Sequence, residues 1–244
     1  MTTPATREKY RRVLLKLSGE SFCTKGGFGI DANELELIAS EVRDAARLGV
    51  QLAVVVGGGN IIRGAELAAA GHIHQATADY MGMLGTVINA LALKEKLVSM
   101  DVPCRVLSAL EVRSVAEPFI RGRALRHLEK GRVVILAAGT GNPFFTTDTC
   151  ASLRATELEC DILLKATKVD GVYDADPRKV PTAKRYESLT FSEAISKRLG
   201  VMDMTALAMC QERGIPVLVF DFKKQGNIAR VVSGESIGTL VHSG

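Results

Sequence analysis

Residues 139–148 read Gly-Thr-Gly-Asn-Pro-Phe-Phe-Thr-Thr-Asp. They follow an apolar run at 133–138, long enough for one buried strand, and precede a segment with helical character at 147–159. The stretch is therefore predicted to be a strand-to-helix loop that carries two glycines, three hydroxyls and a carboxylate. Such a loop brings backbone N–H groups and a helix N-terminus to bear on an anion.

Two further loops have the same character. Lys-Leu-Ser-Gly-Glu at 16–20 follows an apolar strand predicted at 13–17, and Gly-Gly-Gly-Asn at 57–60 follows one at 52–56. In open α/β sheets, ligands bind outside the carboxyl ends of the strands. Three small-residue loops after three buried strands therefore indicate a large, phosphate-rich ligand spread across one edge of a sheet.

Predicted strands and helices alternate along the whole chain. The other strands are expected at 104–107, 161–164, 217–220 and 238–241, and the helices at 31–48, 78–100, 124–130, 147–159, 191–199 and 203–213. The segment 52–56 is fully apolar, as expected for a parallel strand covered on both faces. The pattern predicts an α/β fold, a three-layer α/β/α sandwich with a central, mostly parallel sheet. We expect one domain over 1–244, with a flexible N-terminus at 1–9 and a loop over a site at 170–186.

Composition excludes several classes of protein. The net charge of +4 is scattered and no Lys/Arg run is interleaved with aromatics, so nucleic-acid binding is not expected. No apolar run approaches the ~20 residues of a membrane helix, and the first twelve residues do not form a signal peptide. The five cysteines have no Cys-x-x-Cys spacing, which favours reduced thiols in a cytoplasmic protein over a disulfide framework or a zinc site.

Lys16 and Lys165 are the main candidates for chemistry. Each ends an apolar strand, where a lysine either reaches solvent or points a cation at a bound ligand. Phosphoryl transfer needs cations around the moving group and in-line positioning, which two lysines and a metal could supply. Neither a P-loop nor a Gly-x-Gly-x-x-Gly fingerprint is present. Arg63, shortly after the 57–60 loop, could bind phosphate bidentately.

The acidic candidates are Asp148, Asp170, Asp176 and Asp203. Asp148 and Asp203 stand at helix starts, where capping is the alternative role, and Asp170 precedes a glycine as a turn residue would. The residues leave open which of them, if any, faces magnesium. The histidines have no metal-like or triad-like spacing and are expected at the surface or in satisfied contacts: His72, His74, His127 and His242. Part of the helix predicted at 78–100 is expected in the core or a subunit interface: Met81, Met83, Leu84 and Ile88.

Taken together, these motifs resemble the amino-acid-kinase superfamily and, within it, the bacterial uridylate (UMP) kinases. The resemblance covers about 10–241. It rests on 14–20, 27–31 (Gly-Phe-Gly-Ile-Asp), 57–60 with Arg63-Gly64, 79–83 (Asp-Tyr-Met-Gly-Met), 139–148, 165–173 (Lys-Ala-Thr-Lys-Val-Asp-Gly-Val-Tyr) and 201–203 (Val-Met-Asp). The 79–83 and 142–148 stretches are the most specific to the UMP branch, and 69–78 matches poorly.

The resemblance implies an amino-acid-kinase-like fold and an activity. Such an enzyme transfers the γ-phosphoryl group of ATP to UMP, giving UDP and ADP in pyrimidine nucleotide biosynthesis, with Mg²⁺ carried mainly by the ATP phosphates. It also implies activation by GTP, inhibition by UTP and a homohexamer. No general base is expected, because the acceptor phosphate is already ionised near neutral pH.

The resemblance also implies roles for residues. The catalytic group would be Lys16, Lys165, Asp148 and Asp203. ATP would contact Lys16, Leu17, Ser18, Gly19, Gly59, Arg63, Thr167, Tyr173 and Asp176. UMP would contact Gly58, Asp79, Thr140, Gly141, Asn142, Pro143, Phe144, Phe145, Thr146 and Thr147. The GTP-linked region would be Gly27, Phe28, Gly29, Ile30, Asp31 and Ala32.

Two other interpretations remain. One is another kinase of the superfamily, acting on a carboxylate or carbamate, which would not be expected to carry the 142–148 sequence. The other is a nucleotide-binding sensor or storage protein without turnover, for which loss of one of the two lysines would be expected.

Overall fold

A nine-stranded sheet forms the centre of the computed structural model, which describes residues 10–69, 71, 73–177 and 179–244. The strands lie in the order β4-β3-β5-β2-β1-β6-β8-β9-β7, and each neighbouring pair is parallel except β8 with β9. Their bounds are β1 Arg12–Leu17, β2 Gln51–Val56, β3 Cys104–Ser108, β4 Glu117–Pro118, β5 Val133–Ala137, β6 Ile162–Thr167, β7 Ser188–Thr190, β8 Val217–Asp221 and β9 Thr239–His242. The predicted flexible N-terminus, 1–9, lies outside the described residues.

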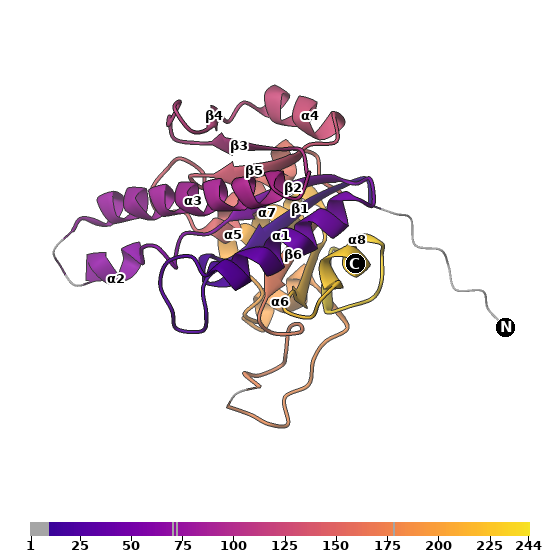
Figure 1. The fold of residues 1–244 in the computed structure, drawn as a ribbon. Helices are drawn as coiled ribbons and strands as arrows, with labels where there is room; N and C mark the ends of the chain where they lie inside the picture. The colour runs from indigo at the N-terminus through magenta and orange to yellow at the C-terminus, as the bar shows by residue number, and fades with distance from the viewer. Residues whose placement is uncertain (1–9, 70, 72, 178) are drawn as a thin grey trace.

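Helices cover both faces of the sheet (Figure 1). Contacts group α1 with α3 and α8 on one face, and α5 with α6 and α7 on the other, where α4 also packs. The bounds are η1 Gly19–Phe22, α1 Ala32–Ala46, α2 Gly64–Ala69, α3 Gln75–Val98, α4 Arg121–Glu129, α5 Thr147–Glu157, α6 Phe191–Ser196, α7 Met204–Arg213 and α8 Asn227–Val232. The predicted three-layer, mostly parallel architecture is confirmed. Across the described residues, no helix is long and apolar enough to cross a membrane.

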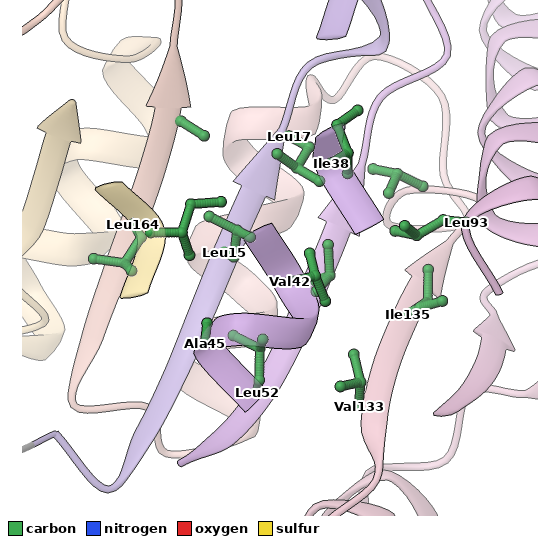
Figure 2. Packing of buried hydrophobic residues seen from close by; sticks show 14 of the residues in the cluster. Leu15, Leu17, Ile38, Val42, Ala45, Leu52, Leu93, Val133, Ile135 and Leu164 are labelled. Atoms are coloured by element: carbon green, nitrogen blue, oxygen red, sulfur yellow. The ribbon is translucent and has the colours of Figure 1, made fainter. Parts of the chain in front are cut away.

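The core is split between the two faces because strand side chains alternate. Leu15 and Leu17 of β1 pack with Ile38 and other α1 residues on one face (Figure 2). Leu14 belongs to the opposite core, under α5. With a period of two, Lys16 shares the face of Leu14. Strand β1, which is apolar between Arg12 and Lys16, therefore places one lysine beneath the N-terminus of α5.

Several predicted boundaries are corrected by the structure. Strand β6 extends to Thr167, so Lys165 lies inside the strand rather than just past its end, and α5 stops at Glu157. The short elements β4, β7 and α8 were not predicted. Strands of two or three residues carry too little alternation to be recognised locally, and they exist here because distant strands offer them partners.

Asp31 caps α1 as predicted. Its carboxylate accepts the N–H groups of Asn33 and Glu34 at 2.9 and 3.1 Å. The Glu34 side chain forms an ion pair with Lys223, in the turn after β8, and so connects α1 to the end of that strand. All five cysteines are free and buried.

Candidate active site

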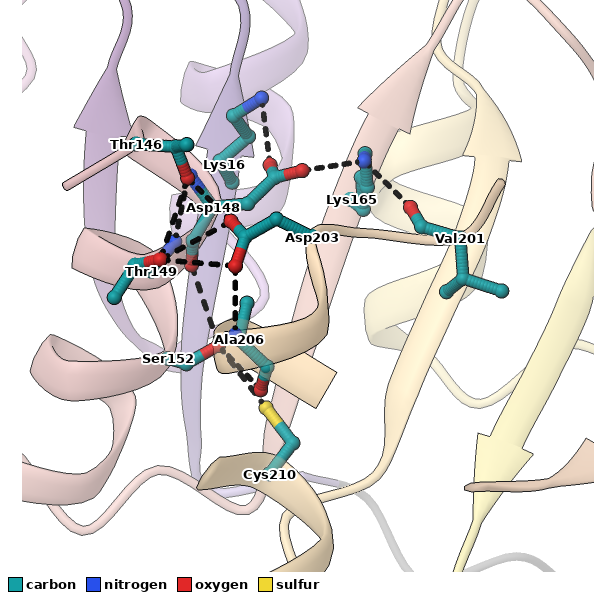
Figure 3. Close-up of polar contacts among 10 residues, drawn as sticks. All are labelled: Lys16, Thr146, Asp148, Thr149, Ser152, Lys165, Val201, Asp203, Ala206 and Cys210. Carbon is teal, nitrogen blue, oxygen red and sulfur yellow. Dashed lines mark hydrogen bonds and ion pairs between the residues drawn. The ribbon is translucent and has the colours of Figure 1, made fainter. Parts of the chain in front are cut away.

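One carboxylate joins the two predicted lysines (Figure 3). Lys16 and Lys165 are partners in the register of parallel strands β1 and β6. Asp148 projects from the first turn of α5 between them, with Oδ1 2.9 Å from Nζ of Lys16 and Oδ2 2.7 Å from Nζ of Lys165. Lys165 also donates to the carbonyl of Val201 at 2.5 Å. Neither lysine extends freely into solvent.

Burial and charge set the protonation of this cluster. Lys16 is only 8 % exposed, and the side chains of Asp148 and Lys165 are 15 % and 16 % exposed. Burial raises the pKa of Asp148, but the charges of Lys16 and Lys165 outweigh it, so that this pKa lies below its usual range. Burial also lowers the pKa of Lys165, although Asp148 opposes the shift. With two cations around one anion, the cluster is net positive and attracts a further anion.

Asp148 is not the N-cap of α5. Thr146 caps the helix, because its hydroxyl accepts the N–H groups of Asp148 and Thr149, each at 3.1 Å. The Asp148 carboxylate is thereby left to contact the lysines. A carboxylate in the first helical turn is also stabilised by the helix dipole. Capping was therefore the wrong alternative for this residue.

Asp203 is a cap that also joins two helices. Its Oδ1 accepts the N–H of Ala206 at 2.9 Å, so it caps α7. The same carboxylate accepts the hydroxyl of Thr149 at 3.1 Å and that of Thr146 (Figure 3). These hydrogen bonds join Asp203 to both α5 and α7. By holding Thr146 and Thr149, Asp203 fixes the start of α5 and so the position of Asp148.

The two glycine loops interlock backbone to backbone. A Cβ atom on Gly19 would lie 2.4 Å from the backbone nitrogen of Gly59, and one on Gly57 would lie 2.5 Å from that of Gly19. No side chain fits at either position. The 16–20 and 57–60 loops therefore form one surface at the carboxyl ends of β1 and β2. Arg63 reaches this surface, since its Nη2 lies 3.5 Å from Oε1 of Glu20.

A cavity of about 220 Å³ opens beside this surface. Its walls come from the glycine loop, the start of α3 and the 139–147 loop, and include Gly58, Gly59, Asp79, Thr140, Phe145 and Thr147. Asp79 holds the far end of the loop, because its carboxylate accepts the backbone N–H of Phe144 at 2.8 Å and the amide of Gln75 at 2.7 Å. Six of the ten predicted UMP contacts line the cavity, and the other four, 141–144, lie between Thr140 and Phe145, which both line it.

The 139–147 loop is held in an unusual backbone conformation. Ala138 and Phe144 have positive φ angles of 61° and 71°, a backbone conformation that residues other than glycine rarely adopt. Thr86 of α3 accepts the N–H of Ala138 at 2.6 Å, and Arg154 of α5 donates to the carbonyl of Gly139 at 3.3 Å. The Arg154 guanidinium itself lies 3.8 Å above the Phe119 ring. The sequence reasoning missed Thr86 and Arg154, which belong to no motif.

A second cavity of about 460 Å³ lies against the segment that follows β6. It is lined by residues of 169–177 and 197–200, among them the predicted ATP contacts Tyr173 and Asp176. Gly200 in its wall directly precedes Val201, whose carbonyl Lys165 contacts. Thr167 ends β6, and its hydroxyl donates to the carbonyl of Val169 at 2.6 Å. The chain from Gly200 to Val201 therefore connects the lining of this cavity to the contact made by Lys165.

The remaining candidates lie apart from the lysines. In the 27–32 region, the N–H of Gly29 donates to the carbonyl of Asn60 and the Asn60 side-chain amide donates to the carbonyl of Gly29, while the Phe28 side chain is exposed. His127 is buried against Glu117 and Arg132, as a satisfied histidine would be, and His72 lies outside the described residues. Within the described ranges, no group of three or more His, Cys, Asp or Glu residues could hold a metal ion.

Glycine loops at the carboxyl edge of a parallel sheet, with two buried lysines on one carboxylate, define a phosphotransferase of the α/β class. The model of the amino acid kinase family matches residues 11–221, and the chain belongs to that family.

Solved structures are similar over nearly the whole chain. A UMP kinase from Bacillus anthracis is 39 % identical over 96 % of this chain and 97 % of its own, with a TM-score of 0.93. A UMP kinase from Ureaplasma parvum is 37 % identical over 97 % of this chain and 100 % of its own, with a TM-score of 0.90. A uridylate kinase from Archaeoglobus fulgidus is 28 % identical over 94 % of this chain and 99 % of its own, with a TM-score of 0.70.

Proposed function

We propose that this protein is an ATP:UMP phosphotransferase, which transfers the γ-phosphoryl group of ATP to UMP and releases UDP and ADP for pyrimidine nucleotide synthesis. The observation that carries the proposal is the Lys16–Asp148–Lys165 cluster at the carboxyl edge of the sheet. Thr147, next to Asp148, lines one cavity, and Gly200, next to the Val201 that Lys165 contacts, lines the other. Similarity to two UMP kinases at 39 % and 37 % identity supports the choice of acceptor.

The two cavities divide the substrates. UMP occupies the cavity walled by Asp79 and the 139–147 loop, with its phosphate toward Gly58 and Gly59. ATP occupies the cavity beside Tyr173 and Asp176, with its phosphates directed past Thr167 toward the 16–19 loop. The donor and acceptor phosphates then meet above Lys16 and Lys165. We propose that the described chain acts as a single domain in this reaction.

The lysines supply electrostatic stabilisation at the point of transfer. Charge on the moving phosphoryl group spreads over its equatorial oxygens, and two buried ammonium groups stabilise it without reorganising at the moment of reaction. Asp148 keeps both cations aimed at one place, and Asp203 and Thr146 keep Asp148 in position. No side chain needs to remove a proton, because the UMP phosphate is already ionised.

The residues present fit a magnesium ion that enters with ATP. Mg²⁺ in phosphoryl-transfer sites is bound by one or two carboxylates together with substrate phosphates. Both oxygens of Asp148 face lysine ammonium groups, Oδ1 at 2.9 Å from Lys16 and Oδ2 at 2.7 Å from Lys165. The ion would therefore be carried mainly by the ATP phosphates. When bound, Mg²⁺ neutralises charge on the phosphate oxygens.

We further propose a homohexamer that responds to GTP and UTP. Helix α3 exposes Tyr80, Leu84 and Ile88, which recur every four residues along one face and suit contact with a second copy of the chain. The expected GTP-linked residues, 27–32, abut the glycine loop through Asn60. A cytoplasmic location accords with five free thiols, the form that a reducing compartment maintains.

A coupled assay of ADP release tests this function. With ATP and Mg²⁺, the purified protein is offered UMP, CMP, acetylglutamate or carbamate, each with and without GTP and UTP. Turnover with UMP far above the others is expected. Preference for acetylglutamate or carbamate would assign another kinase of the family. Nucleotide binding without ADP release from any acceptor would assign a sensor.

A further inference from the structure

Two fully enclosed amides lie behind the glycine loop. Asn60 ends the loop and is 1 % exposed, and Asn89 lies in α3 and is 0 % exposed. Each side chain donates to the other's oxygen, Asn89 to Asn60 at 2.7 Å and Asn60 to Asn89 at 3.0 Å. Asn89 also donates to the carbonyl of Gly57 at 2.7 Å, and Asn60 to that of Gly29 at 2.7 Å.

The chemistry of these contacts fixes the orientation of both amides. A backbone carbonyl accepts and never donates, so each side chain must present its NH₂ group to Gly57 or Gly29. Each NH₂ has two hydrogens, and both are used. Buried polar groups are costly when unpaired, so a satisfied pair of this kind holds its neighbours in one arrangement.

The pair holds backbone at two separate places. At Gly29 it closes a ring, because the N–H of Gly29 donates to the carbonyl of Asn60 at 2.8 Å while the Asn60 amide returns the contact. At Gly57 it holds the loop against α3. The loop and the helix are closely packed here, because a Cβ atom on the next residue, Gly58, would lie 2.6 Å from the carbonyl oxygen of Gly82 in α3.

We propose that Asn89 is a positioning residue for phosphoryl transfer. Its side chain donates to Gly57 and Asn60, and it acts through these two residues. By fixing these two residues it sets the backbone of Gly58 and Gly59, which line the proposed acceptor cavity. Through Asn60 it also joins the turn at Gly29 to the 57–60 loop. A shift of the backbone in one of these two segments should therefore shift the backbone of the other. The catalytic part of this inference rests on the proposed function; the coupling of the two backbone segments does not.

The first experiment measures the coupling without any substrate. Amide hydrogen exchange of 57–60 and 27–31 is compared in unaltered protein, Asn89→Asp and Asn89→Ala. Asn89→Asp places a carboxylate oxygen against the carbonyl oxygen of Gly57. Asn89→Ala only removes the hydrogen bonds, and it replaces Asn89→Asp in the comparison if that variant does not fold. Ala90→Gly is the matched control, since Ala90 is equally buried in the same helix. Loss of a hydrogen bond to a buried group should speed exchange by about tenfold in both segments. Faster exchange at 57–60 alone, or equal effects of Ala90→Gly, would overturn the coupling.

The second experiment separates positioning from folding. Steady-state kinetics with ATP and UMP are measured well below the melting temperature of each variant. Displacement of a catalytic loop by about 1 Å can cost 100-fold in rate, so the Asn89 variants should lose about 10- to 100-fold in kcat, with a smaller change in KM. Ala90→Gly should lower Tm and leave kcat unchanged. A folded Asn89 variant with unchanged kcat refutes the catalytic part. If the unaltered protein has no turnover with UMP, the proposed function fails, and the exchange result still decides the coupling.

Discussion

Lys16 and Lys165 stand directly opposite each other on neighbouring parallel strands and share one carboxylate, that of Asp148. Adjacent strands lie about 4.8 Å apart, so two ammonium groups on the same face would repel each other without an anion between them. Asp148 gives one oxygen to each. The cluster still carries excess positive charge, and the most direct way to balance it is a phosphate above the sheet.

Replacing either lysine should reduce the rate of transfer far more than the affinity for UMP. Lys16→Met and Lys165→Met keep the aliphatic stem and remove the charge. Loss of one preorganised donor typically costs about 3 kcal/mol of barrier, or ~100-fold in kcat. Steady-state kinetics with UMP varied checks this, with Lys130→Met, at an exposed lysine beyond α4, as the control. A near-normal kcat in either variant would remove that lysine from the proposed mechanism.

Asp148→Asn should make folding depend on a bound anion. The substitution leaves two buried cations facing each other, and removing one partner of a buried ion pair costs about 3 kcal/mol or more. Sulfate or ATP should therefore raise the Tm of this variant more than that of the unaltered protein. Asp203→Asn, which changes the cap of α7 and leaves Asp148 between the lysines, serves as the comparison. Equal sulfate effects in all three proteins would contradict the expectation.

The activity should fall at alkaline pH before an ordinary lysine loses its proton. Burial lowers the pKa of Lys165 from the usual 10.5, so its cation disappears earlier as pH rises. The profile of kcat/KM reports groups of the free enzyme and should show this limb below 10.5. Lys165→Arg, always charged, should move the limb upward even if its rate is lower. An alkaline limb that Lys165→Arg leaves in place would assign it to another group.

At acid pH, protonation of Asp148 should lower the stability of the folded protein. The pKa of this carboxyl lies below its unfolded value, because the lysine charges outweigh burial. Its contribution to stability is therefore complete above the ordinary carboxyl pKa and is lost as pH falls through the depressed native value. The Tm of Asp148→Asn should consequently approach that of the unaltered protein in strong acid. A difference in Tm that stays constant with falling pH would argue against this linkage.

UMP should be preferred to CMP by at least about two orders of magnitude in kcat/KM. Uracil offers N3–H as a donor and O4 as an acceptor, and cytosine reverses both, so buried polar groups matched to uracil are left unpaired against cytosine. Thr140 and Thr147 line the acceptor cavity, and Asn142 lies between them. Thr147→Ala and Asn142→Ala should weaken UMP use, and Thr156→Ala, near the far end of α5, should not. Comparable kcat/KM values for the two nucleotides would show that the loop reads only phosphate and ribose.

Much of the fold could be predicted from the sequence, because buried parallel strands are continuous apolar runs and helix starts carry capping residues. β1 and β2 show the first signal, and Asp31 before α1 shows the second. β4 and β7 could not be predicted, since two or three residues become a strand only when distant chain provides the partner.

The candidate site was predictable in part. The two lysines and the glycine loops stand out as polar or small residues at the ends of apolar strands. That one carboxylate serves both lysines could not be predicted, because it depends on the register of β1 against β6 and on the position of α5. Thr86 and Asn89 were missed for a different reason. Both are isolated polar residues within the mainly apolar middle of α3, which was the available signal that they are buried and bonded.

The pairing of β7 has a consequence for the order in which the protein matures on the ribosome. β7 pairs with β9, about fifty residues further along the chain, and β9 in turn is held by β8. Translation therefore delivers the wall of the second cavity, 169–177 and 197–200, well before the strand that anchors its neighbour β7. Until residues 239–242 have been made, β7 lacks the strand it pairs with among the described residues, and this edge of the sheet stays incomplete.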